Sequence, residues 1–358
     1  MPYNAAAVTT RVFNAALDRG DVFLYPFVLD FSGGDRYARF PFMYNGRALT
    51  SLPGGAPAPS CLVSGRAGGN LRFDPPGPSA GGAPVPDGAR AGEGAAAGEG
   101  AAAGEGAAAG EGAAAGEGAA AGGSPAGLHG PAREEFFRSL GLSPDRVYSL
   151  WQIHSRTVHA LDRTFTGGPV EFARTGDGMV SFLPGPFLAL TVADCLPVFL
   201  LDTETGYFAA LHSGWKGTGI VLKALALMKE RGTRPEALAA VLGPCIQSCC
   251  YRVDPDRAAA FEAEFGAPPF SGSGDASYPL GRAAVYRNDP APDSPCEGGW
   301  YLGLQAANAG LLAGAGVRNI AYCRDCTFTD ERLGSYRREG PGYTRMAAMA
   351  GPFEKPPE

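Results

Sequence analysis

Two histidines and one cysteine have the residue types and the spacing of a metal site. His212 directly follows an apolar run of strand length, residues 207–211, and Cys195 stands just before a similar run, residues 197–201. The residues between the two runs have a turn composition, so we expect a hairpin. Residues paired in this hairpin have numbers that sum to about 408, which places Cys195 opposite position 212 or 213. The two side chains are then close enough to bind one ion.

His154 supplies the third ligand in this interpretation, because it lies at the exit of a further predicted strand, residues 146–151. Three protein ligands leave one coordination position open, as in catalytic rather than structural zinc sites. Taken singly, Cys195 is better explained as a buried core residue and His212 as a hydrogen-bonded strand end. Their predicted register favours the metal site over that alternative.

The loop after His212 has the composition of an anion-binding site. It runs from Ser213 to Gly219 and leads into a predicted helix, residues 217–230. Free backbone N–H groups and the positive end of the helix dipole would face an anion there. Lys216 adds a cation beside the predicted metal site, although the loop is not a Walker motif.

Several motifs, taken together and in order, resemble one known family. The chain is similar to the laccase-domain or polyphenol-oxidase family, whose members are now regarded as purine nucleoside phosphorylases, over essentially its whole length outside residues 73–128. The matching motifs are Gln152-x-His154, Ala193-Asp194-Cys195, His212-Ser213-Gly214-Trp215-Lys216-Gly217, Gly243-Pro244-x-Ile246 with Tyr251-x-Val253, and Cys326-Thr327 with Ser335-Tyr336-Arg337-Arg338.

The resemblance implies roles for individual residues. His154, Cys195 and His212 correspond to the zinc ligands of the family, which makes Zn²⁺ rather than copper the expected cofactor. Asp194, next to the ligand Cys195, either acts as a base or orients the ligands. The full set of catalytic candidates is Asp194, Cys195 and Lys216, and the candidate substrate and phosphate contacts are Arg66, Asn70, Gln152, Gly217 and Arg337.

The sequence departs from the family pattern at two of these places. Ser155 follows the first histidine where the family usually has glycine, and Lys216 stands where arginine is frequent. Lysine still binds phosphate as a point charge, but it lacks the bidentate fork of arginine.

The function that the resemblance implies is phosphorolysis of purine nucleosides (adenosine, inosine, guanosine or methylthioadenosine) to free base and ribose 1-phosphate. Adenosine deamination is a further activity of related proteins. The expected partners are therefore small molecules, purine nucleosides and phosphate.

Other functions fit the residues less well. A copper-dependent phenol oxidase of the laccase type needs a trinuclear cluster with many imidazoles, and the chain has only four histidines. A zinc deaminase of the common nucleoside type needs an H-x-E motif, which the sequence lacks. A non-catalytic metal-binding scaffold remains as an alternative, and a Cys195→Ala variant distinguishes it from an enzyme.

A C-x-x-C motif, Cys323 to Cys326, suggests redox or structural-zinc chemistry. It follows a predicted strand instead of opening a helix, and no second C-x-x-C completes a zinc ribbon. The neighbouring Cys249 and Cys250 join it only if the fold brings them near. We expect reduced structural thiols, with Cys326 near the active site as the resemblance implies.

The elements that must position these residues are mostly strands. Because strands outnumber helices and several adjoin in sequence, the pattern predicts an α+β fold instead of a doubly wound parallel one. The resemblance adds a central β-sandwich of mixed sheets flanked by helices. The predicted strands cover residues 22–31, 60–63, 146–151, 187–192, 197–201, 207–211, 238–242 and 317–322, and the predicted helices cover residues 131–141, 217–230 and 301–313.

Residues 73–128 interrupt this pattern. The unit GEGAAA repeats five times within them, and its two glycines cost about 2 kcal/mol per repeat in a helix relative to alanine. With no apolar face to offset this cost, the segment is predicted to be a disordered insertion. Residues 1–72 and 129–353 then form one discontinuous domain, followed by a short tail, residues 354–358.

Composition limits the expected binding partners and cellular location of the protein. A net charge of −6 argues against a general binder of nucleic acid or of anionic membranes, which need basic surfaces. The sequence has no run of about 18 apolar residues, so we expect no membrane-spanning helix. The N-terminus lacks the apolar core of a signal peptide. We therefore expect a cytoplasmic protein with reduced cysteines, and the oligomeric state stays open.

Overall fold

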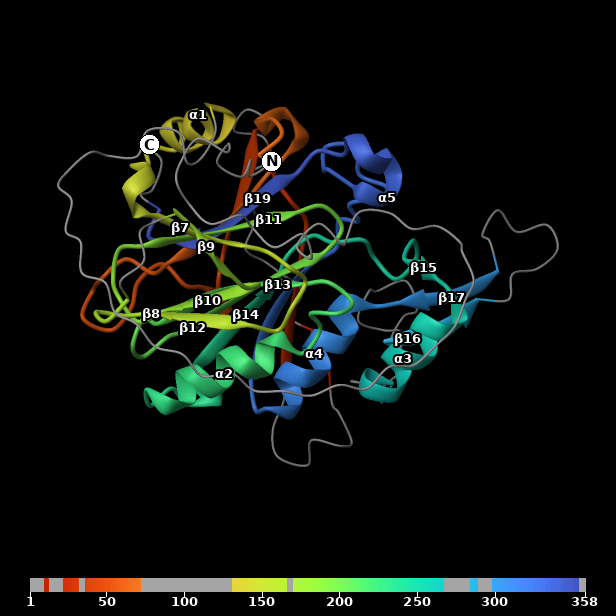
Figure 1. The fold of residues 1–358 in the computed structure, drawn as a ribbon. Coiled ribbons are helices and arrows are strands. Elements are labelled where there is room, and N and C mark those ends of the chain that lie inside the picture. Colours follow the sequence, from red (N-terminus) through yellow and green to blue (C-terminus); the bar gives the residue numbers. More distant parts are fainter. Residues whose placement is uncertain are drawn as a thin grey trace, which may run out of the picture. The chain divides into compact units, whose positions relative to one another are not determined.

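Two β-sheets form the centre of the structure, a computed structural model that describes residues 10–12, 22–31, 36–71, 131–165, 170–266, 284–288 and 298–353. Figure 1 shows the two sheets lying one over the other. The first has eight strands in the order β1 (Thr10–Val12), β2 (Val22–Phe27), β18 (Asn319–Cys323), β14 (Leu238–Leu242), β12 (Leu196–Asp202), β13 (Phe208–Ser213), β10 (Gly178–Ser181) and β8 (Val158–Leu161). The second has six strands in the order β3 (Tyr37–Pro41), β6 (Ser60–Ser64), β19 (Met346–Gly351), β11 (Phe187–Val192), β7 (Val147–Trp151) and β9 (Val170–Thr175).

Smaller elements complete the described part of the chain. Strands β15 (Arg252–Val253), β17 (Gly299–Leu302) and β16 (Val285–Asn288) form a separate sheet, and β4 (Met43–Tyr44) pairs with β5 (Arg47–Ala48). The α-helices are α1 (Pro131–Ser139), α2 (Ile220–Glu230), α3 (Pro255–Phe265), α4 (Leu304–Gly314) and α5 (Tyr336–Glu339).

The alternation of side chains along each strand builds the layers. In β12, Phe199 and Leu201 pack with β11 and β19 of the other sheet, so they lie between the sheets. Val198 and Leu200 point the opposite way and pack with the helices. Because both faces of this strand are covered, all seven of its residues are buried, and it reads in the sequence as a continuous apolar run.

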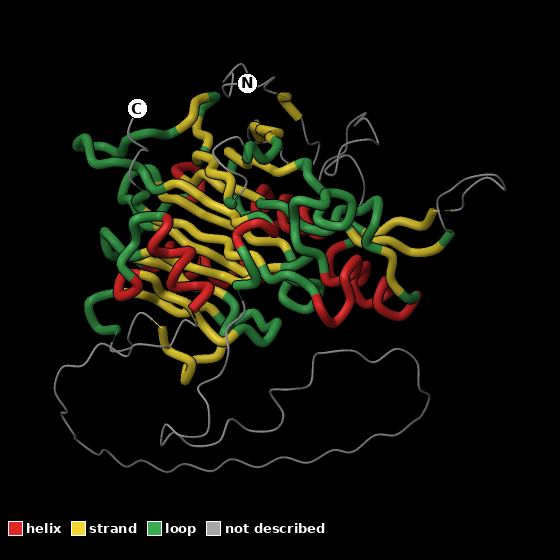
Figure 2. The backbone as a smooth tube through the Cα atoms, turned by 90° about the horizontal axis from the view of Figure 1, so that it is seen from above, coloured by secondary structure: helices red, strands yellow, loops and turns green. Residues whose placement is uncertain are grey.

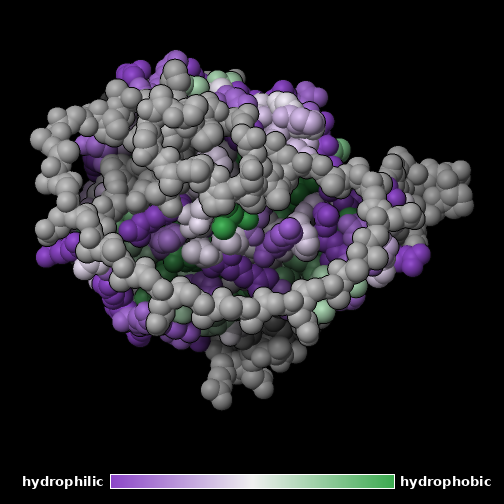
Figure 3. Space-filling view, viewed as in Figure 1, coloured by the Kyte–Doolittle hydropathy of each residue, from purple (hydrophilic) through white to green (hydrophobic). Residues whose placement is uncertain are grey.

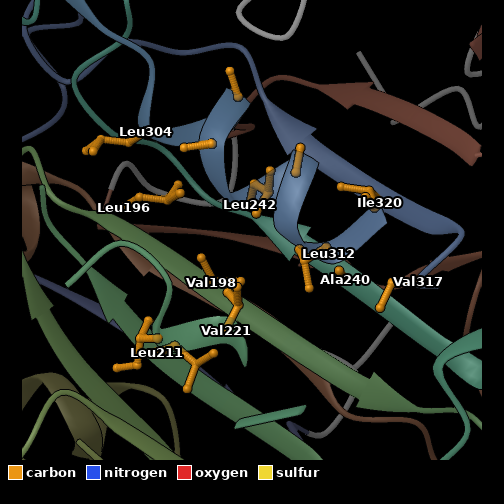
Figure 4. Close-up of a cluster of buried hydrophobic side chains, with 14 of the residues drawn as sticks. Leu196, Val198, Leu211, Val221, Ala240, Leu242, Leu304, Leu312, Val317 and Ile320 are labelled. Atoms are coloured by element: carbon orange, nitrogen blue, oxygen red, sulfur yellow. The ribbon is translucent and has the colours of Figure 1, made fainter. Parts of the chain in front are cut away.

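Helices cover the outer faces of both sheets. Helices α2 and α4 pack on the eight-stranded sheet, and Figure 4 shows Val221 and Leu312 from these helices near Val198 and Ala240 of the strands. Helix α1 covers the six-stranded sheet with Phe136 and Phe137. Seen from above, the strands run in rows with helices against them (Figure 2). The predicted α+β class with a central sandwich is confirmed.

Several boundaries differ from the prediction. Helix α2 begins at Ile220, because Gly219 adopts a left-handed conformation (φ 97°) directly before it. The predicted helix 301–313 begins only at Leu304, since Tyr301 and Leu302 belong to β17. The hairpin exists, but Pro197 pairs with His212 and Leu196 with Ser213, so the register differs by one residue from the expected one.

The predicted insertion, residues 73–128, and the tail, residues 354–358, lie outside the described residues. The discontinuous domain with these boundaries therefore stays a prediction. Within the described part of the chain, no helix is both long and apolar enough to span a membrane.

The two-sheet core indicates which side chains contribute most to the free energy of unfolding. Phe199 is fully buried between the sheets, so Phe199→Ala should lower the free energy of unfolding by about 3–5 kcal/mol. Leu222 on the outer side of α2 is 43% exposed, and Leu222→Ala should change it by less than about 0.5 kcal/mol. Urea denaturation of both variants checks this, and equal losses would contradict the assigned layers.

Candidate metal centre

His154, Cys195 and His212 converge, although they come from three separate segments. One ligand atom of each lies within 4.8 Å of those of the other two, and the two imidazole rings are 4.9 Å apart, edge to face. His154 follows β7, Cys195 lies in the crossing from β11 to β12, and His212 belongs to β13. The group therefore lies where the chain passes from one sheet of the sandwich to the other.

Asp177, a residue that the sequence analysis did not select, holds two of these segments together. Its buried carboxylate accepts a hydrogen bond from His212 Nδ1 at 2.9 Å and another from the backbone N–H of His154 at 3.0 Å. The same carboxylate accepts bonds from the backbone N–H of Ser155 at 2.6 Å and from its hydroxyl at 2.7 Å. A carboxylate behind a ligand histidine fixes its tautomer and orientation, as in many zinc sites.

Two backbone features make room for the group. His154 has a left-handed conformation (φ 60°), which is uncommon for residues other than glycine. The backbone N–H groups of Ile153, His154 and Ser155 all donate to the Asp177 carboxylate and support this conformation. At Gly214, an added Cβ would lie 2.9 Å from Cys195 Sγ and 3.3 Å from His154 Cδ2. Glycine is therefore required by the close approach of the loop to the ligands.

The charges of the group favour a bound cation. Burial raises the pKa of Cys195, but the positive charge of His212 and hydrogen bonds from both histidines outweigh it and bring the pKa to about 6. Burial lowers the pKa of His212, whereas the Cys195 thiolate and the Asp177 hydrogen bond raise it to about 10. Without a metal, the site thus holds a thiolate beside an imidazolium at neutral pH.

The donor set fits a metal ion. Asp177 occupies His212 Nδ1, so Nε2 is the ring nitrogen left to face the thiolate and an ion. Two imidazoles and one thiolate suit zinc and also copper, and three protein ligands leave a position for a substrate oxygen.

Asp194 lies beside the group but is tied to its surroundings. Its carboxylate accepts bonds from the Thr327 hydroxyl at 2.6 Å and from the backbone N–H of Arg337 at 2.7 Å, and its carbonyl accepts one from Ile246 N–H. Its backbone is left-handed (φ 87°). Burial raises the pKa of this carboxyl above its ordinary value despite those bonds.

A cavity with basic walls lies next to Asp194, which bonds Arg337 of the cavity lining. It encloses about 510 Å³ and is lined by Arg252, Arg257 and Arg337 together with Asp254 and Trp300. Arg337 connects it to the ligands through Asp194, the neighbour of Cys195. Arg257 provides a second connection between the cavity and the candidate metal centre. Its guanidinium lies over the Trp215 ring at 4.8 Å, and Trp215 directly follows Gly214, which lies close to Cys195 and His154. Three guanidinium groups against one carboxylate give the cavity a positive character.

The other predicted contact residues lie in varied places. Both ends of the Gln152 amide bond the backbone of Thr191, which fixes the end of β7 to β11. Lys216 is exposed, and its ammonium lies 5.5 Å from the centre of the Trp215 ring.

Close packing explains Gly217, where an added Cβ would approach the Ser155 carbonyl to 3.0 Å. Arg66 forms an ion pair with Glu339, and Asn70 bonds the backbone of Tyr343 and Arg345. In the described part of the chain, none of these contacts joins Gly217, Arg66 or Asn70 to the side chains of His154, Cys195 or His212.

The sequence contained signals for the residues that were missed. Asp177 stands in the polar Thr175-Gly176-Asp177-Gly178 segment just before an apolar strand, and a ligand histidine calls for such a carboxylate. Arg252 is the middle residue of the Tyr251-x-Val253 motif, and Arg257 follows the motif by four residues. Only the fold shows that these arginines and Arg337 line one cavity.

Comparison with known proteins identifies the family. The family model described as multi-copper polyphenol oxidoreductase laccase matches residues 128–351. The chain belongs to this family. A relative from Corynebacterium glutamicum, named purine nucleoside phosphorylase, is 34% identical over 203 residues, which are 56% of this chain and 72% of the relative.

Two further proteins extend the comparison. A protein of an unknown prokaryotic organism, named adenosine deaminase RL5, is 29% identical over 57% of this chain and 76% of its own length. The crystal structure of the hypothetical protein YfiH of Bacillus licheniformis has a TM-score of 0.50 and 26% identity, and the match covers 62% of this chain and 79% of that one. The family relation is thus supported by sequence and by fold, and the relatives bear names of enzymes.

Removing the charge of Asp177 should weaken metal binding at the candidate centre. In an Asp177→Asn variant the amide holds His212 less firmly, so metal affinity should fall about 10–100-fold. Competition with a chromogenic chelator measures this change. Asp162, which pairs with Arg231 at the surface, provides the control: Asp162→Asn should leave the affinity unchanged, and an equal effect of both variants would contradict the assignment.

Metal affinity should also depend on pH. Between pH 6 and 10 the Cys195 thiol is already ionised, whereas His212 must lose a proton to bind. Affinity should therefore rise through this range by about tenfold per pH unit, and more steeply below pH 6. Chelator competition in a series of buffers tests the slope. A flat profile between pH 6 and 9 would show that no imidazolium has to be deprotonated.

Proposed function

We propose that the protein is a zinc-dependent purine nucleoside phosphorylase that acts on adenosine, inosine, guanosine or methylthioadenosine. The observation that carries this proposal is the three-arginine cavity, which Arg337 links through Asp194 to Cys195 of the His154, Cys195 and His212 group. The names of its relatives agree with it. A cytoplasmic location, as expected from the sequence, belongs to the proposal.

The cavity supplies the binding of phosphate. Phosphate carries between one and two negative charges at neutral pH, and guanidinium groups bind it through charge-assisted hydrogen bonds. Of the basic residues predicted from sequence, we assign Arg337 to this role, because it lines the cavity and lies over the Tyr251 ring.

Exposed apolar side chains beside the site supply the binding of the purine. Of the large hydrophobic residues that are exposed in the described structure, Ile153, Phe328 and Tyr336 each stand next to His154, Thr327 or Arg337 in sequence. On the face shown in Figure 3, outside the grey atoms, hydrophobic areas are small and set among hydrophilic ones. Small apolar areas of this kind suit the flat faces of a nucleobase rather than a large partner surface.

The reaction makes a bond between a phosphate oxygen and C1′ of the ribose and breaks the bond from C1′ to the purine nitrogen. The arginines hold the phosphate next to the sugar and offset its charge. A bound zinc ion would supply Lewis acidity toward a substrate oxygen. Asp194 has both carboxylate oxygens in hydrogen bonds to protein groups, so of its two predicted roles we assign it the orienting one.

Deamination of adenosine is the second candidate activity, and the relative named adenosine deaminase RL5 favours it. In this reaction water, instead of phosphate, is the nucleophile: a bond forms between its oxygen and C6 of the purine, and the bond from C6 to the amino nitrogen breaks with release of ammonia. A copper oxidase is disfavoured by the four histidines of the entire chain, which cannot supply a trinuclear cluster in addition to this group.

Turnover of a nucleoside panel tests the proposal. The purified protein, with stoichiometric zinc, is given adenosine, inosine, guanosine and methylthioadenosine with and without phosphate, and products are separated by chromatography. We expect free base only when phosphate is present, together with ribose 1-phosphate or, from methylthioadenosine, methylthioribose 1-phosphate. A Cys195→Ala variant should lose metal and turnover together. Absence of turnover in every combination would overturn the proposal, as would stoichiometric copper with strong blue absorption.

The phosphate role of Arg337 gives a separate expectation. Arg337→Ala retains the backbone N–H that bonds Asp194, so it removes only the guanidinium from the cavity. Loss of hydrogen bonds to a charged ligand should raise the KM for phosphate about 10–100-fold, with metal content unchanged. Arg234→Ala, which breaks a surface pair with Glu204, should have no effect. Equal KM values for phosphate in the wild type and Arg337→Ala would place phosphate elsewhere.

A further inference from the structure

Three cysteines that the proposed reaction does not use lie together. The Sγ atoms of Cys249, Cys250 and Cys326 are all within 4.8 Å of one another, and those of Cys249 and Cys250 are 3.3 Å apart. Cys326 is buried, Cys250 is half-buried and Cys249 is exposed. The cluster therefore reaches from the interior to the surface. Cys323, the other half of the C-x-x-C motif, is not part of it.

The backbone holds the three residues in place. Cys326 pairs with Cys245 in an isolated β-bridge, which joins the two segments that carry the cluster. The Cys326 sulfur accepts the backbone N–H of Gln247 at 3.3 Å. The Gln247 carbonyl in turn accepts the backbone N–H of Cys250 at 2.9 Å. The thiols are thus set close together by hydrogen bonds of the main chain before any ligand binds.

We propose that Cys249, Cys250 and Cys326 form a second metal site, which binds one thiophilic d¹⁰ ion, Zn²⁺ or Cu⁺. Thiolates are the preferred ligands of both ions. Two sulfurs bound to one zinc at about 2.3 Å in tetrahedral geometry are about 3.8 Å apart. This value lies between the 3.3 Å of Cys249 and Cys250 and the 4.8 Å limit of the cluster. Copper(I) takes the three sulfurs alone, whereas zinc adds a water on the exposed side of Cys249.

Electrostatics agree with this geometry. Hydrogen bonds from the Cys249 and Cys250 thiols, together with the Gln247 N–H, lower the pKa of Cys326 despite its burial. Hydrogen bonds with Cys249 and Cys326 raise the pKa of Cys250, so a cation that binds all three sulfurs displaces the proton of that thiol.

The ion would stabilise the position of Asp194, although it binds outside the proposed reaction site. Thr327, next to Cys326, donates to the Asp194 carboxylate, and Ile246, in the segment of Cys249 and Cys250, donates to the Asp194 carbonyl. An ion that joins the two segments holds both donors in position around Asp194. The site is thus structural, and it uses none of the ligands of the His154, Cys195 and His212 group.

Cobalt binding tests the proposal independently of enzyme activity. The full-length protein is reduced with a phosphine, freed of metal and titrated with Co²⁺ under argon. We expect two equivalents to bind. The thiolate-to-cobalt absorbance of one should be about three times that of the other, because three thiolates bind one ion and a single thiolate binds the other. A single equivalent without the stronger absorbance would exclude zinc as the ion of this cluster.

Variants assign the two signals. Cys249→Ser changes an exposed side chain and should abolish the stronger absorbance while the weaker one stays, and Cys326→Ser should do the same. Cys195→Ser is the matched control, because it should remove only the weaker absorbance. Circular dichroism confirms the fold of each variant. Retention of the stronger absorbance in folded Cys249→Ser would exclude this cluster as its source.

Two further arms distinguish the ions and exclude a disulfide. One equivalent of zinc beyond that held by the first site should protect the three thiols from a thiol reagent. In the second arm, Cu⁺ should be held against a copper(I) chelator. Protection in either arm supports the site and names its ion. Free reaction of the thiols in both arms, or a disulfide among them found by mass spectrometry in the protein as isolated, would overturn it.

Discussion

The buried carboxylate of Asp177 is the interaction on which the rest of the centre depends. It binds the imidazole of His212 from one sheet and the backbone N–H groups of residues 153–155, which follow a strand of the other sheet. A carboxylate with no exposed surface is stable only when its charge is met by donors, and here the donors are the ligand and the ligand-bearing loop. Satisfying one buried charge thus brings together two candidate metal ligands that are 58 positions apart in sequence.

This constraint explains why the centre lies at the end of the sandwich. Between the sheets, the alternation of side chains demands apolar residues on both faces of β12, so polar ligands are excluded there. Where the strands end, backbone donors become free and the chain turns with left-handed residues such as His154 and Asp194. The rigid sheets fix the ends of the loops, and the loops supply the donors that orient the ligands.

The sequence predicted the parts of this arrangement that depend on local pattern. Apolar runs bounded by turn residues gave the strands and the hairpin, and the scarcity of histidine drew attention to His154 and His212. The register missed by one residue, because the exact turn geometry decides it. The role of Asp177 and the shared cavity of Arg252, Arg257 and Arg337 were not predictable locally. They depend on segments that meet only when both sheets have formed.

Asp194, like Asp177, is held by hydrogen bonds from separate segments of the chain. Each of its three bonds comes from a different segment: Ile246 before the cysteine turn, Thr327 after β18, and Arg337 at the start of α5. The segment of Arg337 also lines the basic cavity, and those of Ile246 and Thr327 carry the cysteine cluster. A shift of any one of them moves Asp194 and, through the next peptide bond, the Cys195 ligand. The candidate metal centre and the basic cavity are therefore coupled through Asp194, so that a change in any of the three segments is felt at both.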